Sequence, residues 1–207
     1  MIDFLIALGI SLIFCAGFAA IELIKRVFGV SPEIMRRFAH IVSGCVVILE
    51  YLYLPAIWVV LLIIGGGILF YIFSRLDLLT SVNDVERQTY GQYVLSLGYL
   101  CTYVVSLSNP KVFIPAILII TLADSLAGLV GTLLKSKIRT WAGTITFFLV
   151  ALGILVAYGD GLTYPWQGMY FFAPCIAVGL TFVERITPLG FDNLTVPVAG
   201  AILLLAF

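Results

Sequence analysis

Residues 121 to 144 read TLADSLAGLVGTLLKSKIRTWAGT, an apolar run that carries one acid, Asp124, and ends in a short basic loop. A carboxylate inside a membrane costs about 2.5 to 3.5 kcal/mol on insertion scales, so its presence indicates a functional site or a charged partner. On a helix, one face would carry four residues at the i, i+4, i+7, i+11 spacing, namely Asp124, Gly128, Gly131 and Lys135. We therefore expect an acid and an ammonium group at the two ends of this face, with open space between them.

The two glycines of this face have two interpretations. They leave room for an anionic, oxygen-rich ligand with a bound metal, because aspartate oxygens suit a hard cation such as Mg²⁺. Alternatively, Gly128 and Gly131 serve only helix packing, since small residues at this spacing let membrane helices approach closely. In that second interpretation Asp124 only neutralises a neighbouring charge.

The composition indicates an integral membrane protein with an all-α fold. Apolar residues make up 62% of the 207 residues and charged residues only 11%. Since each crossing takes about 20 residues, eight transmembrane helices with short loops use nearly the whole chain, and seven is the alternative. We expect a single helical domain over residues 1 to 207.

The formal net charge of the chain is zero, which argues against a broad basic surface, and we expect no nucleic-acid partner.

Breaks in hydropathy at charged and Pro/Gly clusters predict the helix boundaries. The predicted spans are residues 4–24, 37–54, 56–73, 92–108, 112–134, 141–158, 168–184 and 193–207.

Basic residues are distributed unevenly between the connections. Ten of the eleven Lys and Arg residues flank the first, third, fifth and seventh connections, and only Lys111 lies at another. The positive-inside rule then places these four connections in the cytoplasm and both termini outside. The ten are Lys25, Arg26, Arg36, Arg37, Arg75, Arg87, Lys135, Lys137, Arg139 and Arg185.

Cysteine and histidine usage excludes several kinds of site. The four cysteines lie in separate apolar segments without a C-x-x-C pair, which argues against a disulfide framework, and we interpret them as small core residues. His40 is the single histidine, so a histidine-rich metal site is excluded.

The remaining polar clusters all map to the predicted cytoplasmic face. Arg36 and His40 are i, i+4 neighbours that can hold phosphate, although the arginines at 36 and 37 are also ordinary interface anchors. Tyr90-Gly91 can form a turn that brings a ring and backbone amides toward a nucleotide. The cations and hydroxyls of Lys135, Lys137, Arg139 and Thr140 precede Gly143-Thr144 at a helix start, which is a good anion site.

Two more acids lie at the seventh connection. Asp192, with Glu184 or Asp124, would make a carboxylate group able to bind Mg²⁺ or to remove a proton from an alcohol. Asn193 adds a neutral ligand or donor. The competing interpretation is that Asp192 only caps the last helix.

In order along the chain, these motifs resemble a known family. They are Arg36-Arg37-x-x-His40-x-x-x-Gly44, Tyr90-Gly91, Asp124-x-x-Ala127-x-x-x-Gly131, Arg139-Thr140-x-Ala142-Gly143-Thr144, and Glu184 followed by Asp192-Asn193 and Pro197. The chain resembles the CTP-dependent membrane lipid-alcohol kinases, which include dolichol kinase, phytol kinase and the yeast-type diacylglycerol kinase.

The resemblance implies transfer of the terminal phosphate of CTP, with Mg²⁺, to the hydroxyl of a polyprenol, dolichol, phytol or diacylglycerol at the cytoplasmic membrane surface. Metal ligands would be Asp124, Asp192 and Glu184, and catalytic groups Asp124, Asp192 and His40. Nucleotide and phosphate contacts would come from Arg36, Arg37, Tyr90, Gly91, Gly128, Gly131, Lys135, Lys137, Arg139, Thr140, Gly143, Thr144 and Asn193.

Two other functions stay open at this point. A cytidylyltransferase that makes a CDP-lipid would also use CTP and magnesium, but with a richer acidic cluster. A small lipid or ion transporter is favoured by the depth of Asp124, about 16 Å below Lys135 on a straight helix. The sequence leaves the identity of the alcohol and the oligomeric state open.

Overall fold

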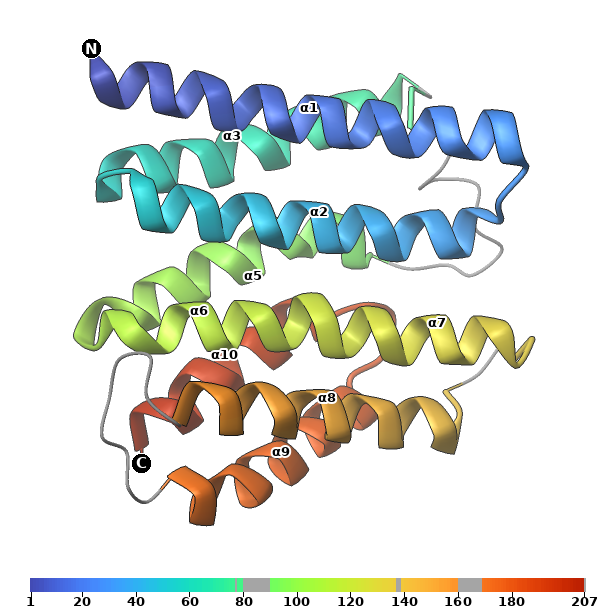
Figure 1. Cartoon of the computed structure of the whole chain (residues 1–207), viewed down its shortest axis with the longest axis vertical. Coiled ribbons are helices and arrows are strands. Elements are labelled where there is room, and N and C mark those ends of the chain that lie inside the picture. The colour runs from blue at the N-terminus through green and yellow to red at the C-terminus, as the bar shows by residue number, and fades with distance from the viewer. Residues whose placement is uncertain (77, 80–89, 137–138, 160–168, 207) are drawn as a thin grey trace. The chain divides into compact units, whose positions relative to one another are not determined.

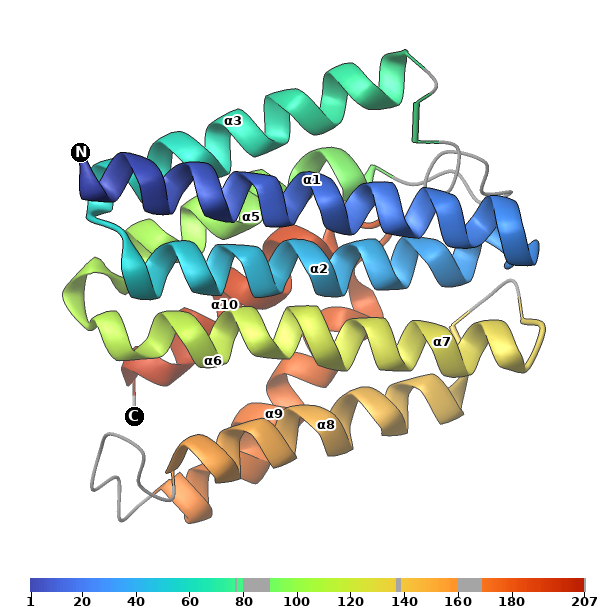
Figure 2. The same cartoon turned by 45° about the horizontal axis from the view of Figure 1, so that its top comes forward.

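The computed structural model describes residues 1–76, 78–79, 90–136, 139–159 and 169–206, and every regular element in these ranges is a helix (Figures 1 and 2). The all-α prediction is confirmed for these residues. The chain divides into two compact units, Met1–Gln88 (unit 1) and Thr89–Phe207 (unit 2). The expectation of a single domain stays a prediction.

The described part of unit 1 contains three long helices: α1 (Ile2–Phe28), α2 (Pro32–Tyr53) and α3 (Ala56–Arg75). Glycine and proline set the helix ends. Gly29 follows α1 with φ of 63°, the left-handed conformation that ends many helices, and Pro32 occupies the first turn of α2. The short connection leaves α1 and α2 antiparallel and side by side (Figure 1).

A buried cluster holds α1 against α2. Phe18 and Ile21 of α1 pack with Met35 and Ala39 of α2 and with Leu79, which follows α3. These α1 and α2 positions recur at helical spacing, so each helix turns one apolar face toward its neighbour.

The described part of unit 2 is built on one long central helical run. This run consists of α6 (Phe113–Leu118), a π-helical stretch (Ile119–Asp124) and α7 (Ser125–Leu133), and the other helices are α5 (Gly91–Val105), α8 (Trp141–Gly159), α9 (Met169–Ile186) and α10 (Asp192–Ala206). Short 3₁₀ turns at Ser106–Ser108 and Pro110–Val112 join α5 to α6.

The central run is the core of unit 2. Of its most apolar window, 67% is buried, against 22% for that of α8. Ile117, Ile119 and Ile120 are fully buried. In the surrounding layer, α5 packs on α10, and α8 packs on both α7 and α9. The acid at position 124 therefore lies on the best-enclosed helix of the unit.

Asp124 is the last residue of the π-helical stretch. A π-helical turn places one extra residue in the turn and shifts the following side chains around the helix axis, and such turns occur frequently at functional sites. The stretch is a local departure from the straight α-helix that the sequence predicts for residues 112–134.

Gly98 lets α5 and α10 approach closely. A Cβ atom at residue 98 would lie 2.0 Å from the backbone oxygen of Asn193 and 3.1 Å from the Cα of Leu194. Only glycine fits this contact. The contact fixes the first turn of α10, which carries Asp192, against α5.

The described helices match a membrane protein. Four of them are long and apolar enough to cross a bilayer, namely Ile2–Phe28, Ala56–Arg75, Pro110–Leu133 and Trp141–Tyr158. Each of the eight predicted spans coincides with a helical stretch to within a few residues, but the crossing of all eight and the orientation of the termini stay predictions.

The prediction that the cysteines are core residues is wrong for most of them. Cys15, Cys45 and Cys175 are exposed, and Cys101 is half-buried. In a membrane protein an apolar residue faces lipid as favourably as it faces the core, so an apolar context alone does not predict burial.

Candidate active site

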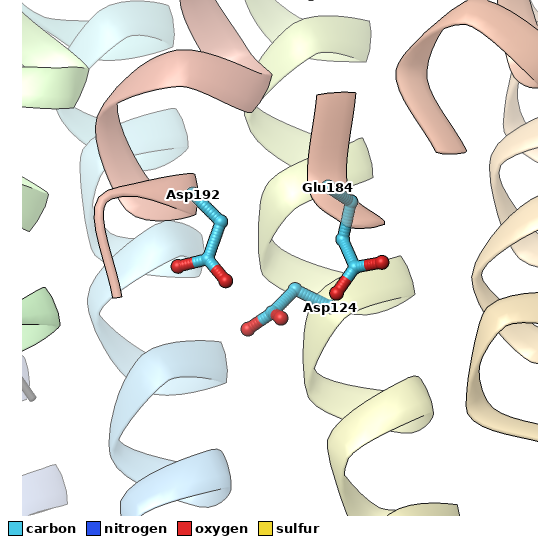
Figure 3. A group of neighbouring side chains, drawn as sticks. All are labelled: Asp124, Glu184 and Asp192. Atoms are coloured by element: carbon cyan, nitrogen blue, oxygen red, sulfur yellow. The ribbon is translucent and has the colours of Figure 1, made fainter. Parts of the chain in front are cut away.

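Three acidic side chains from three elements of unit 2 meet in one place, which we call the acidic cluster. Asp124 ends the π-helical stretch, Glu184 lies in the last turn of α9, and Asp192 is the first residue of α10. One oxygen from each carboxylate lies within 4.8 Å of the others, and all three residues are buried, with exposed fractions of 6%, 7% and 8%. Figure 3 shows the three side chains directed toward a shared space.

Arg139 holds two members of the acidic cluster. Its Nε lies 3.2 Å from Glu184 Oε1, and its Nη2 donates to Asp192 Oδ2 at 2.5 Å. Its Nη1 also donates to the backbone oxygen of Glu184. The planar guanidinium suits this forked arrangement, which ties the segment before α8 to the ends of α9 and α10.

The positions of Glu184 and Asp192 show which helix ends lie beside Asp124, whose depth below Lys135 the sequence analysis put at about 16 Å. The central run ends at Leu133, nine residues after Asp124, or about 14 Å along the helix. However, Asp192 begins α10 and Glu184 lies two residues before the end of α9. Two helix ends thus lie at the level of Asp124, whereas α7 extends beyond them (Figure 1). Asp124 lies in the middle of the central run, but it is therefore close to the connection between α9 and α10.

The start of α8 is held closely against α7. The Gly143 amide donates to Thr140 Oγ1 at 3.0 Å, which caps the helix. A Cβ at residue 143 would lie 3.0 Å from the Ala127 backbone oxygen, so the glycine permits this approach. Arg185 Nη1 donates to Thr144 Oγ1 at 2.7 Å. The predicted anion site is thus a compact helix start, one of whose amides already serves the cap.

The start of α5, at Tyr90 and Gly91, contacts residues that precede and follow Asp192 in the chain. Asn193 Nδ2 donates to the Gly91 backbone oxygen at 2.8 Å, and the Tyr90 amide donates to the Leu189 oxygen at 2.9 Å. The rings of Tyr90 and Phe191 lie 6.2 Å apart. The start of α5 is therefore bound to the connection that leads into Asp192.

The comparison with known proteins shows the family of the chain. A phytol kinase from Synechocystis sp. is 30% identical over an alignment of 197 residues, which covers 88% of this chain and 82% of the relative. The chain belongs to the family of CTP-dependent lipid-alcohol kinases. As a member, it is a phosphotransferase with an alcohol acceptor. No family model matches the chain, and no solved structure matches it.

The end of α7 corrects one expectation for this kinase. Lys135 follows the helix with φ of 53°, and the amides of Lys135 and Ser136 donate back to Thr132 and Gly131 at 2.9 and 3.1 Å. This is the usual left-handed helix termination. Lys135 therefore does not share a helical face with Asp124, because the helix ends two residues earlier. Lys137 lies outside the described residues.

Gly131 of the kinase faces open space. No described atom lies within 4 Å of a Cβ built at this position. Packing among the described helices therefore does not require glycine there, and room for a ligand stays a prediction. Gly128 lies in α7 one turn after Asp124, and its backbone oxygen accepts from Thr132 Oγ1 at 3.0 Å.

The other predicted phosphate contacts of the kinase lie in unit 1. Arg36 and Arg37 are in the first part of α2, where Arg36 Nη2 pairs with Glu33 Oε2 at 3.3 Å. His40 is buried in the same helix, and Ser43 donates to its backbone oxygen at 2.9 Å. These residues thus share one helix, whereas the acidic cluster belongs to unit 2.

The sequence did not predict a contact between Arg185 and the Trp141 ring beside the site. The Arg185 guanidinium lies 4.6 Å from the centre of the Trp141 ring while it donates to Thr144.

The hydroxyls of Thr121 and Ser125, near Asp124, were also not predicted as part of the site. They are fully buried and have no hydrogen-bond partner among the described residues. The signal for both hydroxyls was present in the sequence, since they flank the acid in an apolar run.

Proposed function

We propose that this kinase transfers the terminal phosphate of CTP to the hydroxyl of a membrane lipid alcohol. The similarity to a phytol kinase makes an isoprenoid alcohol such as phytol the first candidate acceptor. In this reaction a bond forms between the alcohol oxygen and the terminal phosphorus, the bond from that phosphorus to the bridging oxygen breaks, and CDP leaves.

The acidic cluster carries the proposal. The site contains three carboxylates, of Asp124, Glu184 and Asp192, and the one guanidinium of Arg139 pairs with two of them. The carboxylates therefore outnumber this cation, and such an arrangement suits a divalent cation. Carboxylate oxygens are donors that Mg²⁺ prefers, and one oxygen from each of the three acids already lies within 4.8 Å of the others, so an approach of the three side chains would let them hold one ion. When bound, Mg²⁺ would neutralise charge on the phosphates of the nucleotide.

The chain's own groups would position the two substrates. Arg139 would exchange one carboxylate contact for a phosphate oxygen, because guanidinium binds both with the same forked geometry. Further phosphate contacts are proposed for Lys135, Lys137 and the Thr140–Thr144 helix start, and for Arg36 and Arg37 of α2. The nucleotide would approach Gly128, the open space at Gly131 and the Tyr90-Gly91-Asn193 group.

A carboxylate would accept the proton of the alcohol. Asp124 and Asp192 are the candidates, since both lie in the acidic cluster and either can accept a proton from a hydroxyl within hydrogen-bond reach. His40 is the alternative base, from unit 1. Phosphoryl transfer depends mainly on positioning and charge neutralisation, so no covalent nucleophile is required.

We place this reaction at the cytoplasmic membrane face of a chain with eight crossings. Ten of the eleven basic residues flank the connections that carry the motifs, which supports this orientation. The helix ends beside Asp124 support access from that face over a transporter site at the bilayer centre.

One experiment tests the reaction type. Purified protein in detergent is incubated with Mg²⁺, a panel of phytol, farnesol, polyprenol, dolichol and diacylglycerol, and CTP that is labelled at either the terminal or the α-phosphate. We expect a labelled lipid from the terminal label only. A lipid product labelled from the α-phosphate identifies a cytidylyltransferase, and no lipid product from any alcohol contradicts the proposal.

A further inference from the structure

An apolar cavity in unit 1 lies beside the buried cluster of α1 and α2 and is separate from the candidate active site. It has a volume of about 380 Å³ and is lined by α1, by the last part of α3 and by Leu78 and Leu79. This volume falls within the usual range for small-molecule sites, about 300 to 1,000 Å³. No residue of the acidic cluster, and none of the proposed nucleotide contacts, lines it.

The residues that line the cavity give it one aromatic end and one charged end. Phe14, Phe18, Glu22 and Arg26 follow one another at four-residue spacing, so they form a single stripe along α1. The stripe extends about 18 Å, from twelve residues at 1.5 Å each. Its first half is aromatic, with the rings of Phe14 and Phe18 4.7 Å apart and Phe70 of α3 5.7 Å from Phe18. Its second half is charged.

The charged end offers one acceptor and one donor side by side. Arg26 Nε lies 3.2 Å from Glu22 Oε1. The Glu22 side chain is only 11% exposed, whereas that of Arg26 is 67% exposed. A buried acid in a helix long and apolar enough to span a membrane is costly, and such residues pair with another charge and are found along substrate and ion paths.

We propose that this cavity binds the lipid-alcohol acceptor, with the hydrocarbon chain along the phenylalanines and the hydroxyl between Glu22 and Arg26. A hydroxyl donates to the carboxylate and accepts from the guanidinium, so it satisfies both groups at once. A phosphate in the same place also meets the Arg26 guanidinium, but that group is 67% exposed and its attraction is screened by water, whereas the Glu22 carboxylate is only 11% exposed and repels the added negative charge more strongly. The cavity therefore holds the alcohol and rejects its phosphorylated product.

This inference rests on the proposed function for the identity of the ligand. It assigns to unit 1 a second role in the reaction, selection of the unphosphorylated lipid. Product formed at the acidic cluster would then not compete with fresh acceptor for this cavity.

Cys15 provides a direct probe, because it lines the cavity and is exposed. In a variant that keeps only this cysteine, with Cys45, Cys101 and Cys175 replaced by alanine, alkylation by a small apolar maleimide is timed in detergent. We expect phytol to slow the alkylation of Cys15 about tenfold, and phytyl phosphate at the same concentration to slow it little. The matched control keeps only Cys175, which is exposed on α9 of unit 2, and phytol should leave its alkylation rate unchanged.

A second variant tests the role of the charged pair. Glu22→Gln removes the repulsion, so phytyl phosphate should now protect Cys15 about as well as phytol does. Equal protection by phytol, phytyl phosphate and hexadecane in the unsubstituted protein would overturn the inference, because it indicates nonspecific filling by any hydrocarbon. Protection of Cys175 to the same degree as Cys15 would also overturn it.

The labelling does not depend on catalysis. Protection of Cys15 should persist in Asp124→Asn and without CTP, so a failed kinase assay and a failed cavity assay are separate results. Phosphate transfer with no protection of Cys15 refutes the cavity alone, and protection without transfer refutes the kinase reaction alone.

Discussion

Arg139 and Asp192 lie 53 residues apart in the chain, and Arg139 Nη2 donates to Asp192 Oδ2 at 2.5 Å. The same guanidinium reaches Glu184, so one side chain joins the segment before α8 to α9 and α10. Removal of one partner of a largely buried ion pair leaves the other charge uncompensated, so Arg139 is important for stability in addition to its proposed contact with phosphate.

Arg139→Lys keeps the positive charge but loses the forked contacts. Hydrogen bonds to charged groups contribute about 1.5 to 3 kcal/mol. For a chain of this size we therefore expect the melting temperature to fall by about 5 °C, with phosphate transfer reduced about tenfold or more. Arg139→Gln should be worse in both measurements, since it also removes the charge. Thermal unfolding in detergent and initial rates of phosphate transfer test this ranking of the two variants. A lysine variant with the melting temperature and rate of the unsubstituted protein would contradict the role of the forked guanidinium contacts.

Gly98→Ala should destabilise the protein by forcing α5 away from α10. The added Cβ would lie 2.0 Å from the Asn193 oxygen, a backbone atom that cannot move independently. We expect a loss of about 1 to 3 kcal/mol, as for other overpacked sites. Gly153→Ala in α8 is the matched control, because its Cβ meets no described atom within 4 Å, and it should keep or raise the melting temperature. Equal melting temperatures for both variants would show that the α5–α10 approach is not close.

Gly131→Leu separates the two interpretations of the glycines of α7. The open space around residue 131 accommodates a side chain, so stability should change by about 1 kcal/mol at most. If the space receives the nucleotide, the KM for CTP should rise about tenfold while the melting temperature stays near its original value. A large fall in melting temperature with an unchanged KM supports helix packing instead.

The membrane orientation is tested by labelling at opposite ends of unit 2. Ser136→Cys lies just after α7, and Ser108→Cys lies between α5 and α6. In a background without other cysteines, a membrane-impermeant thiol reagent should label position 108 in intact cells and position 136 only after the membrane is opened. The reverse pattern would place the acidic cluster on the outer face.

Much of the fold follows from apolar run length. The predicted span 141–158 matches α8 at Trp141–Gly159, and 56–73 matches α3 at Ala56–Arg75. The π-helical stretch at Ile119–Asp124 was not predicted, because its residues suit an α-helix and packing against neighbours decides the turn. The exposure of Cys15 and Cys175 was mispredicted because lipid and protein core are equally apolar.

The acidic cluster was predictable in part. Motif order and the distribution of basic residues predict Asp124, Glu184 and Asp192 at one membrane face, and the structure brings one oxygen of each within 4.8 Å of the others. The partner of the acids was not predicted. Arg139 was expected among phosphate contacts, and its pairing with Glu184 and Asp192 depends on the packing of α8 to α10, which no local pattern records.

The most direct test of the acidic cluster is transfer of the terminal phosphate from labelled CTP to phytol, with Mg²⁺, compared between the unsubstituted protein and Asp124→Asn. The amide keeps the size and shape of the side chain but removes its negative charge and its basicity. We predict a loss of labelled lipid phosphate of about 10³-fold or more, with melting temperature and detergent elution near those of the unsubstituted protein. Labelled product formed by Asp124→Asn at an undiminished rate would contradict a role for this carboxylate in metal binding or proton transfer.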